Sequence, residues 1–138
     1  WRVDEGAGTV EFLIEVTGLG HGFLGLGIDA TGMTRADMVI CYVDPSGVAH
    51  AVDAWSSGNE RPRADVELGR QSNIDAATVS GGIEAGVTTV RFTRPLDTGE
   101  VGDGVITRGS VPVIFSYNPE VTMTGLQDME YHRNRRGA

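Results

Sequence analysis

The chain is poor in cysteine, the residue that forms disulfides and many metal sites, and it has no long hydrophobic run. Its 138 residues include one cysteine, Cys41, which excludes an intramolecular disulfide and any zinc or iron–sulfur site held by several cysteines. Cys41 lies inside an apolar run, so we expect a buried thiol. The apolar runs are far shorter than a bilayer requires, which predicts no transmembrane helix.

Positive charge is also scarce. All eleven basic residues are arginines, and they face nineteen acidic residues, which gives a net charge of −8. A nucleic-acid-binding surface needs an excess of positive charge, so this composition argues against a nucleic-acid partner. No Gly-x-Ser-x-Gly, His-Glu-x-x-His or His-x-His motif is present, and the acidic residues form no recognisable acid/base pair. We therefore do not expect the chain to be an enzyme by itself.

What the chain has in quantity is glycine, in a pattern typical of a β protein. Twenty glycines, five prolines and many short apolar runs predict an all-β domain with numerous turns. The central stretch, residues 22–43, contains an apolar run at Phe23–Ile28, a polar turn at residues 29–32 and a second apolar run at Met38–Val43. This strand, turn and strand organise the rest of the chain.

Further strands are predicted on both sides of this stretch. They are expected at Thr9–Val16, Val48–Trp55, Ser72–Ser80, Val87–Arg94 and Val111–Tyr117, with the end of another at Trp1–Val3. A turn is expected at residues 44–47, and residues 81–82 with 85–86 are expected to join the later pair. The spacing predicts a two-sheet antiparallel, immunoglobulin-like β-sandwich, with residues 1–138 as a single domain. Because the chain begins at Trp1 and not at methionine, we expect it to be excised from a longer multidomain protein.

Five blocks of residues, in their order and spacing, resemble the DOMON domain. The blocks are residues 1–4 with the following strand, residues 22–40, residues 52–56 with Asp65, residues 91–99 with Asp103, and residues 131–137. This β-sandwich family is named after the amino-terminal part of dopamine β-monooxygenase and includes the cytochrome domain of cellobiose dehydrogenase. The resemblance implies an extracellular or otherwise extracytoplasmic location.

The resemblance also implies a cofactor, because some DOMON domains are similar to b-type cytochromes that hold haem b between a methionine and a histidine. Met33 and His132 match those two positions. A thioether and an imidazole leave the iron no open coordination position, which suits electron transfer to a redox partner domain or protein. The chain has no Cys-x-x-Cys-His motif, so the haem would be held non-covalently.

Other residues are expected around the haem. The expected slot walls are Phe23, Tyr131, Leu24, Tyr117 and Met123, and the expected propionate partners are Arg133, Arg135 and Arg136. Arginine suits the second role because its planar guanidinium pairs with a carboxylate at two points.

The residues leave alternatives open. Met33 could instead be a packed side chain in a turn, and Met123 or Met129 could take its place as a ligand. His132 could instead be a surface residue. His21 and His50 are the other candidates for the histidine ligand; we expect His21 in an exposed turn and His50 on a strand face. Other DOMON domains lack haem, so the alternative function is a recognition module that binds a carbohydrate, another small ligand or a neighbouring domain.

A second set of candidate residues is acidic. Asp37, Asp53 and Asp65 fall in the blocks where DOMON domains like that of dopamine β-monooxygenase place a hard-cation site, so the resemblance implies calcium or sodium. Alternatively, Asp37 and Asp53 cap turns or pair with arginines, for which Arg35, Arg61 and Arg63 are the candidates.

Overall fold

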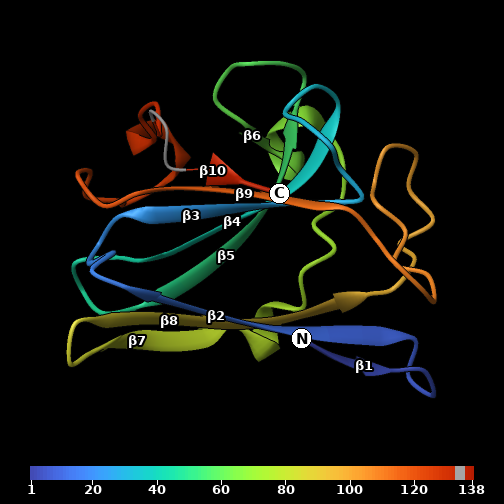
Figure 1. Ribbon diagram of the computed structural model, residues 1–138, viewed down its shortest axis with the longest axis horizontal. Helices are drawn as coiled ribbons and strands as arrows, with labels where there is room; N and C mark the ends of the chain where they lie inside the picture. The colour runs from blue at the N-terminus through green and yellow to red at the C-terminus, as the bar shows by residue number, and fades with distance from the viewer. Residues whose placement is uncertain (133–135) are drawn as a thin grey trace.

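Two antiparallel sheets pack face to face in the computed structural model, which describes residues 1–132 and 136–138 (Figure 1). The first sheet has the order β1 (Arg2–Asp4), β2 (Thr9–Thr17), β8 (Val87–Pro95) and β7 (Ser80–Glu84). The second has the order β10 (Arg136–Gly137), β9 (Val113–Asn118), β3 (Phe23–Ile28), β4 (Ala36–Val43), β5 (Ala49–Ser56) and β6 (Arg63–Ala64). Three short 3₁₀ helices are η1 (Asp65–Leu68), η2 (Ala76–Thr78) and η3 (Leu126–Asp128). The predicted antiparallel β-sandwich is confirmed.

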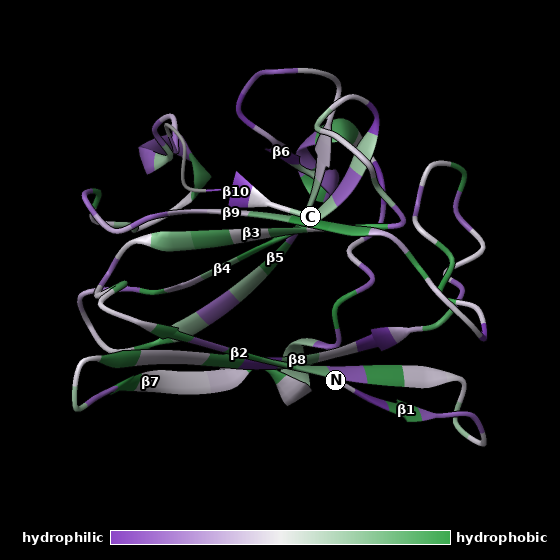
Figure 2. Ribbon diagram, in the orientation of Figure 1, coloured by the Kyte–Doolittle hydropathy of each residue, from purple (hydrophilic) through white to green (hydrophobic). Residues whose placement is uncertain are grey.

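The main hydrophobic core lies between the two sheets. Alternate residues of β2 and β8 point into it, and Phe12 stacks on Phe92 with their ring centroids 5.2 Å apart. Figure 2 shows the resulting change between hydrophobic and hydrophilic segments along these two strands. Cys41 belongs to the same core and is 1% exposed, as expected for a buried thiol.

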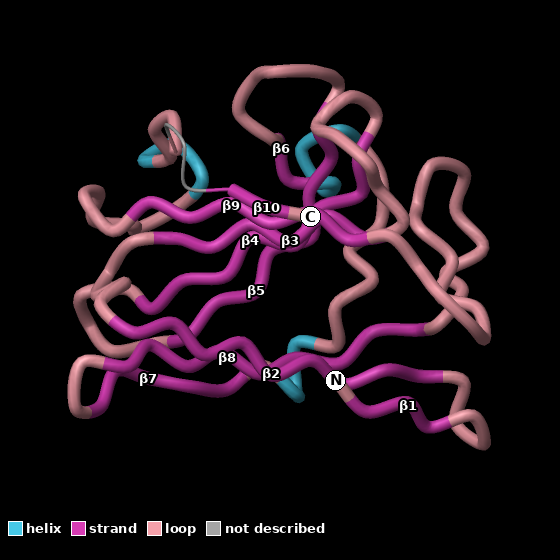
Figure 3. The backbone as a smooth tube through the Cα atoms, in the orientation of Figure 1, coloured by secondary structure: helices cyan, strands magenta, loops and turns pink. Residues whose placement is uncertain are grey.

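The six-stranded sheet is also covered on its outer face. Every residue of β4 is buried: one set of alternate side chains joins the core between the sheets, and the other joins a second apolar cluster outside. Met38 and Ile40 of β4 belong to the outer cluster, which also contains Phe23 and Ile114. Figure 3 shows loops and the short helices η1 and η3 above this sheet. A continuous apolar run such as β4 is the pattern expected of a strand buried on both faces.

The β4–β5 hairpin follows the predicted turn. The Gly47 amide donates to the Asp44 carbonyl oxygen at 2.9 Å, and Gly47 has a φ of 88°, which favours glycine. The Asp44 side chain accepts the amide of Ser46 at 2.9 Å and thereby fixes the turn.

The prediction for the β7–β8 pair was wrong in its first half. The strand expected at Ser72–Ser80 is a loop with η2, and the strand instead begins at Ser80. Position 81, inside β7, requires glycine because the backbone there passes close to Thr89. A Cβ atom would overlap the Thr89 carbonyl oxygen. The turn itself consists of Ala85 and Gly86, both with positive φ, which is the geometry of a two-residue hairpin.

Among the described residues, the structure has no helix that is long and apolar enough to cross a membrane.

Candidate functional site

Two neighbouring cavities lie against the outer face of the six-stranded sheet. The first has a volume of about 160 Å³ and the second about 450 Å³. They share five lining residues, which are Met33, Met38, Asn59, Ser116 and His132, so we treat them as two compartments of one slot. The combined size is in the range of pockets that hold small ligands or cofactors.

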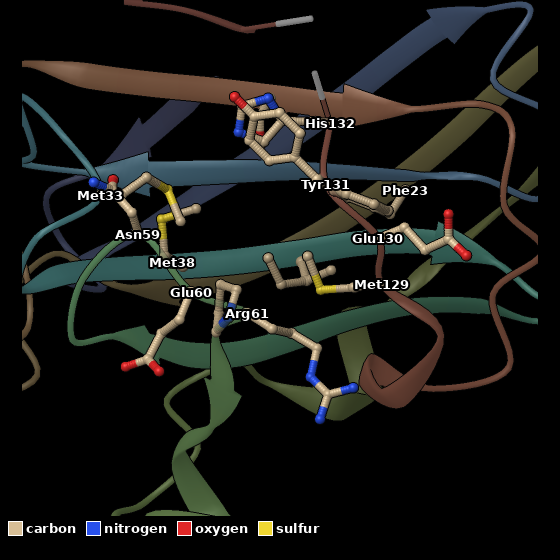
Figure 4. A pocket seen from close by; sticks show the side chains of 13 residues that line it. Phe23, Met33, Met38, Asn59, Glu60, Arg61, Met129, Glu130, Tyr131 and His132 are labelled. Carbon is tan, nitrogen blue, oxygen red and sulfur yellow. The ribbon is translucent and has the colours of Figure 1, made fainter. Parts of the chain in front are cut away.

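Met33 and His132 reach this slot from opposite parts of the chain. Met33 is half-buried in the loop between β3 and β4, and His132 is half-buried in the segment that follows η3. Figure 4 shows Met33 and Met38 on one side of the first cavity and the rings of Tyr131 and His132 along its upper rim in that view. The fold therefore brings the two predicted axial ligands to the border of a common cavity.

The other predicted wall residues divide into two groups. Phe23 is 1% exposed and lines the first cavity, as does Tyr131, whose ring lies 4.8 Å from that of His132. Leu24 instead packs against the core between the sheets, because it occupies the opposite face of β3. Met123 is fully buried in the outer cluster and lines neither compartment, whereas Met129 lines the first.

Of the three arginines expected near the propionates, Arg136 is among the described residues. Arg133 and Arg135 lie outside the described residues. Arg136, on β10, lines the second cavity, and Arg61, from the loop between β5 and β6, lines the first. The Arg61 guanidinium donates to the carbonyl oxygen of Gln127 at 2.9 Å and so ties its loop to η3.

The competing histidines have partners elsewhere. His21 is half-buried, not exposed as expected, and its Nδ1 atom lies 3.0 Å from the carbonyl oxygen of Val43. The Nε2 atom of His50 pairs with the Asp44 carboxylate at 2.8 Å, and its ring stacks on Tyr42. Neither histidine lines the slot.

The predicted acidic residues are buried together at another place, away from the slot. Asp37, Asp53 and Asp65 are 3%, 4% and 2% exposed. Asp37 does not pair with any of the arginines expected: its carboxylate accepts a hydrogen bond from Arg94 at 2.8 Å, and Arg94 is itself 1% exposed. The amide of Gly104 donates to the same carboxylate oxygen at 2.8 Å. This buried ion pair joins β8 of one sheet to β4 of the other.

Loop residues complete the acidic group. The backbone amide of Asn73 donates to the Asp53 carboxylate at 2.6 Å, and its side-chain amide donates to Glu100 at 2.8 Å and to Asp103 at 2.9 Å. Carboxylate oxygens of Asp65, Glu100 and Asp103 lie within 4.8 Å of one another. These five acidic residues, Asp37, Asp53, Asp65, Glu100 and Asp103, are called the acidic cluster below.

Arg70 neutralises part of the acidic cluster. Its guanidinium lies 3.5 Å from Asp65 and 3.2 Å from Asp103, and it covers the ring of Trp55 at 4.8 Å from the centroid. With Arg94, the cluster therefore contains two guanidinium groups for five carboxyls. The second oxygen of Asp65, Oδ1, is buried and has no hydrogen-bond partner among the described residues.

Burial, and to a smaller extent the excess of carboxylates, raises the pKa of three carboxyls of the acidic cluster. Burial, reinforced by the charges of Asp37 and Asp65, raises the pKa of Asp53 to about 7. Burial also raises the pKa of Asp65 to about 6, against the opposing effect of Arg70. The pKa of Asp103 is raised for the same principal reason.

Several residues of both sites were not predicted. Asn59 lines both compartments of the slot from a loop that carries no motif, so the sequence offers no signal for it. Arg94 did carry a signal, because it follows Val90 and Phe92 at alternate positions on the inward face of β8. A buried arginine requires a buried counterion, which on the facing strand is Asp37.

In a comparison with protein-family models, the DOMON domain model matches residues 1–118. The matched range includes Met33 and the three predicted aspartates, and it ends before Tyr131 and His132.

Proposed function

Because this chain belongs to the DOMON domain family, we propose that it is an extracytoplasmic domain that binds haem b and exchanges electrons with a redox partner. The observation that carries the proposal is that Met33 and His132, distant in sequence, border the same slot on the apolar face of the six-stranded sheet. Bound haem supplies an iron that gains and loses one electron.

The donor set and the lining fit this group. Met33 offers a thioether sulfur and His132 an imidazole nitrogen, and these two ligand types favour electron transfer. Phe23, Met38 and Ile40 are almost completely buried and give the slot an apolar floor. Burial of a large, mostly apolar ring against such a surface stabilises non-covalent binding.

Two arginines of the slot suit the polar edge of the same group. Arg61 lines one compartment and Arg136 the other, and both side chains belong to exposed residues. We propose that these two guanidinium groups, together with Arg133 and Arg135, attract the propionate carboxylates to the solvent side of the slot.

The test is the visible spectrum of the purified domain in its oxidised and dithionite-reduced forms, with and without added haemin. Wild type is expected to show sharp reduced α and β bands. Met33→Ala and His132→Ala are expected to lose these bands, because each removes one axial ligand. Met129→Ala and His50→Ala are the matched controls, since Met129 lines the same cavity without being a proposed ligand and His50 pairs with Asp44 outside it.

A colourless wild-type protein that gains no Soret band with haemin would contradict the proposal. That result would favour a haem-free module that recognises a carbohydrate, another small ligand or a neighbouring domain.

We further propose that the acidic cluster holds a hard cation, calcium or sodium. Asp65, Glu100 and Asp103 would be its ligands, and Asp37 and Asp53 would add negative charge to the site. Support comes from the deficit of positive charge and from the buried Oδ1 atom of Asp65, which lacks a hydrogen-bond partner among the described residues. Carboxylate oxygens are the preferred ligands of such cations.

Thermal unfolding tests this second proposal. Calcium or sodium is expected to raise Tm of the wild type, and more at pH 8 than at pH 5, because protons compete for the same carboxyls. Asp65→Asn should abolish this increase, while Asp97→Asn, an exposed aspartate outside the cluster, should preserve it. An equal response of Asp65→Asn and wild type would contradict a site at Asp65.

A further inference from the structure

Two glycines of the central strand β3 lie beneath the slot, and we propose that Gly25 and Gly27 set its depth and thereby leave room for the haem. This inference rests on the haem-binding function proposed above. Neither glycine is among the residues expected to ligate the iron or to form the walls of the slot.

The alternation of β3 directs the two glycine positions to the outer face of the sheet. Phe23 belongs to the outer cluster, while Leu24, Leu26 and Ile28 pack in or against the core between the sheets. Because successive residues of a strand point to opposite faces, residues 25 and 27 share the outer face with Phe23. At these two positions the middle of the sheet therefore carries no side chain.

Side chains of the adjacent strands occupy the space that is left. A Cβ atom on Gly25 would lie 3.2 Å from Cδ1 of Ile40 and 3.3 Å from Cε of Met38. A Cβ atom on Gly27 would lie 2.6 Å from Cγ1 of Ile114 and 3.1 Å from the sulfur of Met38. Met38 and Ile114 are also the direct cross-strand neighbours of Gly27 in the two flanking strands.

These same neighbours form the lining of the slot. Met38 lines both compartments, Ile40 lines the first and Ile114 the second. Figure 4 shows Met38 beside Met33 at the edge of the first compartment. A methyl group on β3 would push these side chains away from the strand, and the slot is the open volume that they already border.

The backbone does not explain why these residues are glycines. Neither Gly25 nor Gly27 has a positive φ, so alanine is conformationally allowed at both positions. Glycine inside a strand is itself unfavourable, by about 0.5–1 kcal/mol relative to alanine. The space above the strand is what the two glycines provide.

Gly25→Ala is the most informative variant. Its nearest contacts are with the ends of flexible side chains, so the haem-free protein is expected to fold and to unfold at the same or a slightly higher temperature. Its haemin dissociation constant, measured from the Soret band, is expected to rise about tenfold or more. Gly27→Ala should weaken haemin binding further, because its new methyl group meets Cγ1 of Ile114, which is close to the backbone.

A control and a rescue variant separate depth from general effects of replacing glycine. Gly82 lies in β7 of the other sheet, its φ is outside the left-handed region, and a Cβ atom there would have no neighbour within 4 Å. Gly82→Ala should therefore leave haemin binding unchanged. Ile40→Val removes the Cδ1 atom nearest to the new methyl group of Gly25→Ala. Combining these two substitutions should therefore restore much of the lost affinity.

Each result is decisive. If wild type binds haemin and Gly25→Ala binds it equally tightly, the inferred role of the glycines is wrong while the haem-binding function stands. If wild type binds no haemin, both are wrong. Weak binding by Gly25→Ala that Ile40→Val does not relieve would also overturn the inference, because loss of depth predicts relief.

Discussion

Arg94 places a charge between two sheets whose facing side chains are mainly apolar. Its guanidinium donates to Asp37 at 2.8 Å and to the carbonyl oxygen of Gly104 at 3.3 Å, and its Nε atom has no hydrogen-bond partner among the described residues. Such a buried pair adds little net stability compared with apolar residues, but removing one partner leaves the other charge buried alone.

Asp37→Ala is therefore expected to lower the free energy of unfolding by about 3–5 kcal/mol. The double variant Asp37→Leu/Arg94→Met should recover most of this loss, because neither partner of the pair is then left as an unpaired buried charge. Denaturant unfolding of the two variants and wild type measures both effects. Equal destabilisation by the single and double variants would show that packing, and not the unpaired charge, determines the cost.

Asp53 makes stability depend on pH near neutrality. Its pKa is about 7 in the folded protein against 3.8 for an ordinary aspartate, so between these values the folded state holds a proton that the unfolded state has lost. Stability from this group is complete below about pH 4 and is lost as the pH rises through about 7. Asp65, with a pKa of about 6, acts in the same direction.

We expect the free energy of unfolding to fall between pH 5 and pH 8 and Asp53→Asn to reduce that slope. Asparagine can still accept the Asn73 amide through its side-chain oxygen, so the fold is preserved. The difference between the two proteins isolates this group from other carboxyls. Parallel pH profiles for Asp53→Asn and wild type would contradict the raised pKa of Asp53. The measurement is made with a chelator and without sodium, so that bound cations do not contribute.

At the scale of elements, the turn of the β7–β8 hairpin holds an alanine in a backbone conformation that is unfavourable for it. Its two turn residues both have positive φ, 48° for Ala85 and 77° for Gly86. Glycine adopts this conformation without penalty, whereas alanine does so at a cost of roughly 1 kcal/mol or more. Asparagine followed by glycine is the preferred pair for such a turn.

Ala85→Asn should accordingly raise the free energy of unfolding by about 0.5–1 kcal/mol. Ala85→Val should lower it, because a β-branched side chain is especially unfavourable at positive φ. Thermal unfolding measures both effects: Tm is expected to rise for Ala85→Asn and to fall for Ala85→Val. Shifts in the same direction would show that the turn conformation is not what governs stability there.

The elements of the fold differ in how far they can be predicted. The central strands β3 and β4 follow from their apolar runs, and the Asp44–Gly47 turn follows from its residue types. The edge strand β7 does not, because its two glycines indicate a turn while the close approach of the Thr89 backbone requires Gly81 inside the strand. Local preferences carry no information about such a contact between strands.

At the scale of the whole molecule, the net charge of −8 is distributed over a small domain. Surface ion pairs such as Arg91 with Glu11 and Arg108 with Glu5 involve partly or largely exposed side chains and contribute little. Repulsion among the excess carboxylates therefore dominates the long-range electrostatics, and it decreases as added salt shortens the screening length to below about 10 Å.

Adding potassium chloride up to about 0.5 M is expected to raise Tm. Potassium avoids the sodium proposed for the acidic cluster, and a chelator removes calcium. Replacing Glu15 and Glu84 with glutamine should reduce this dependence, since both are exposed and have no ion pair among the described residues. A Tm that falls with salt would show that attractive ion pairs outweigh the repulsion.

The sequence by itself determined the two-layer β architecture, because the alternation of apolar and polar residues and the turn residues act locally along the chain. It also pointed to Met33 and His132 through the order of the DOMON blocks. What only the tertiary structure decided is which residues meet: Arg94 with Asp37, Arg70 with Asp65 and Asp103, and Met38 with the space above Gly25 and Gly27. These contacts join strands and loops that are distant in the chain, and their partners are selected by the register and packing of the two sheets, which no local pattern encodes.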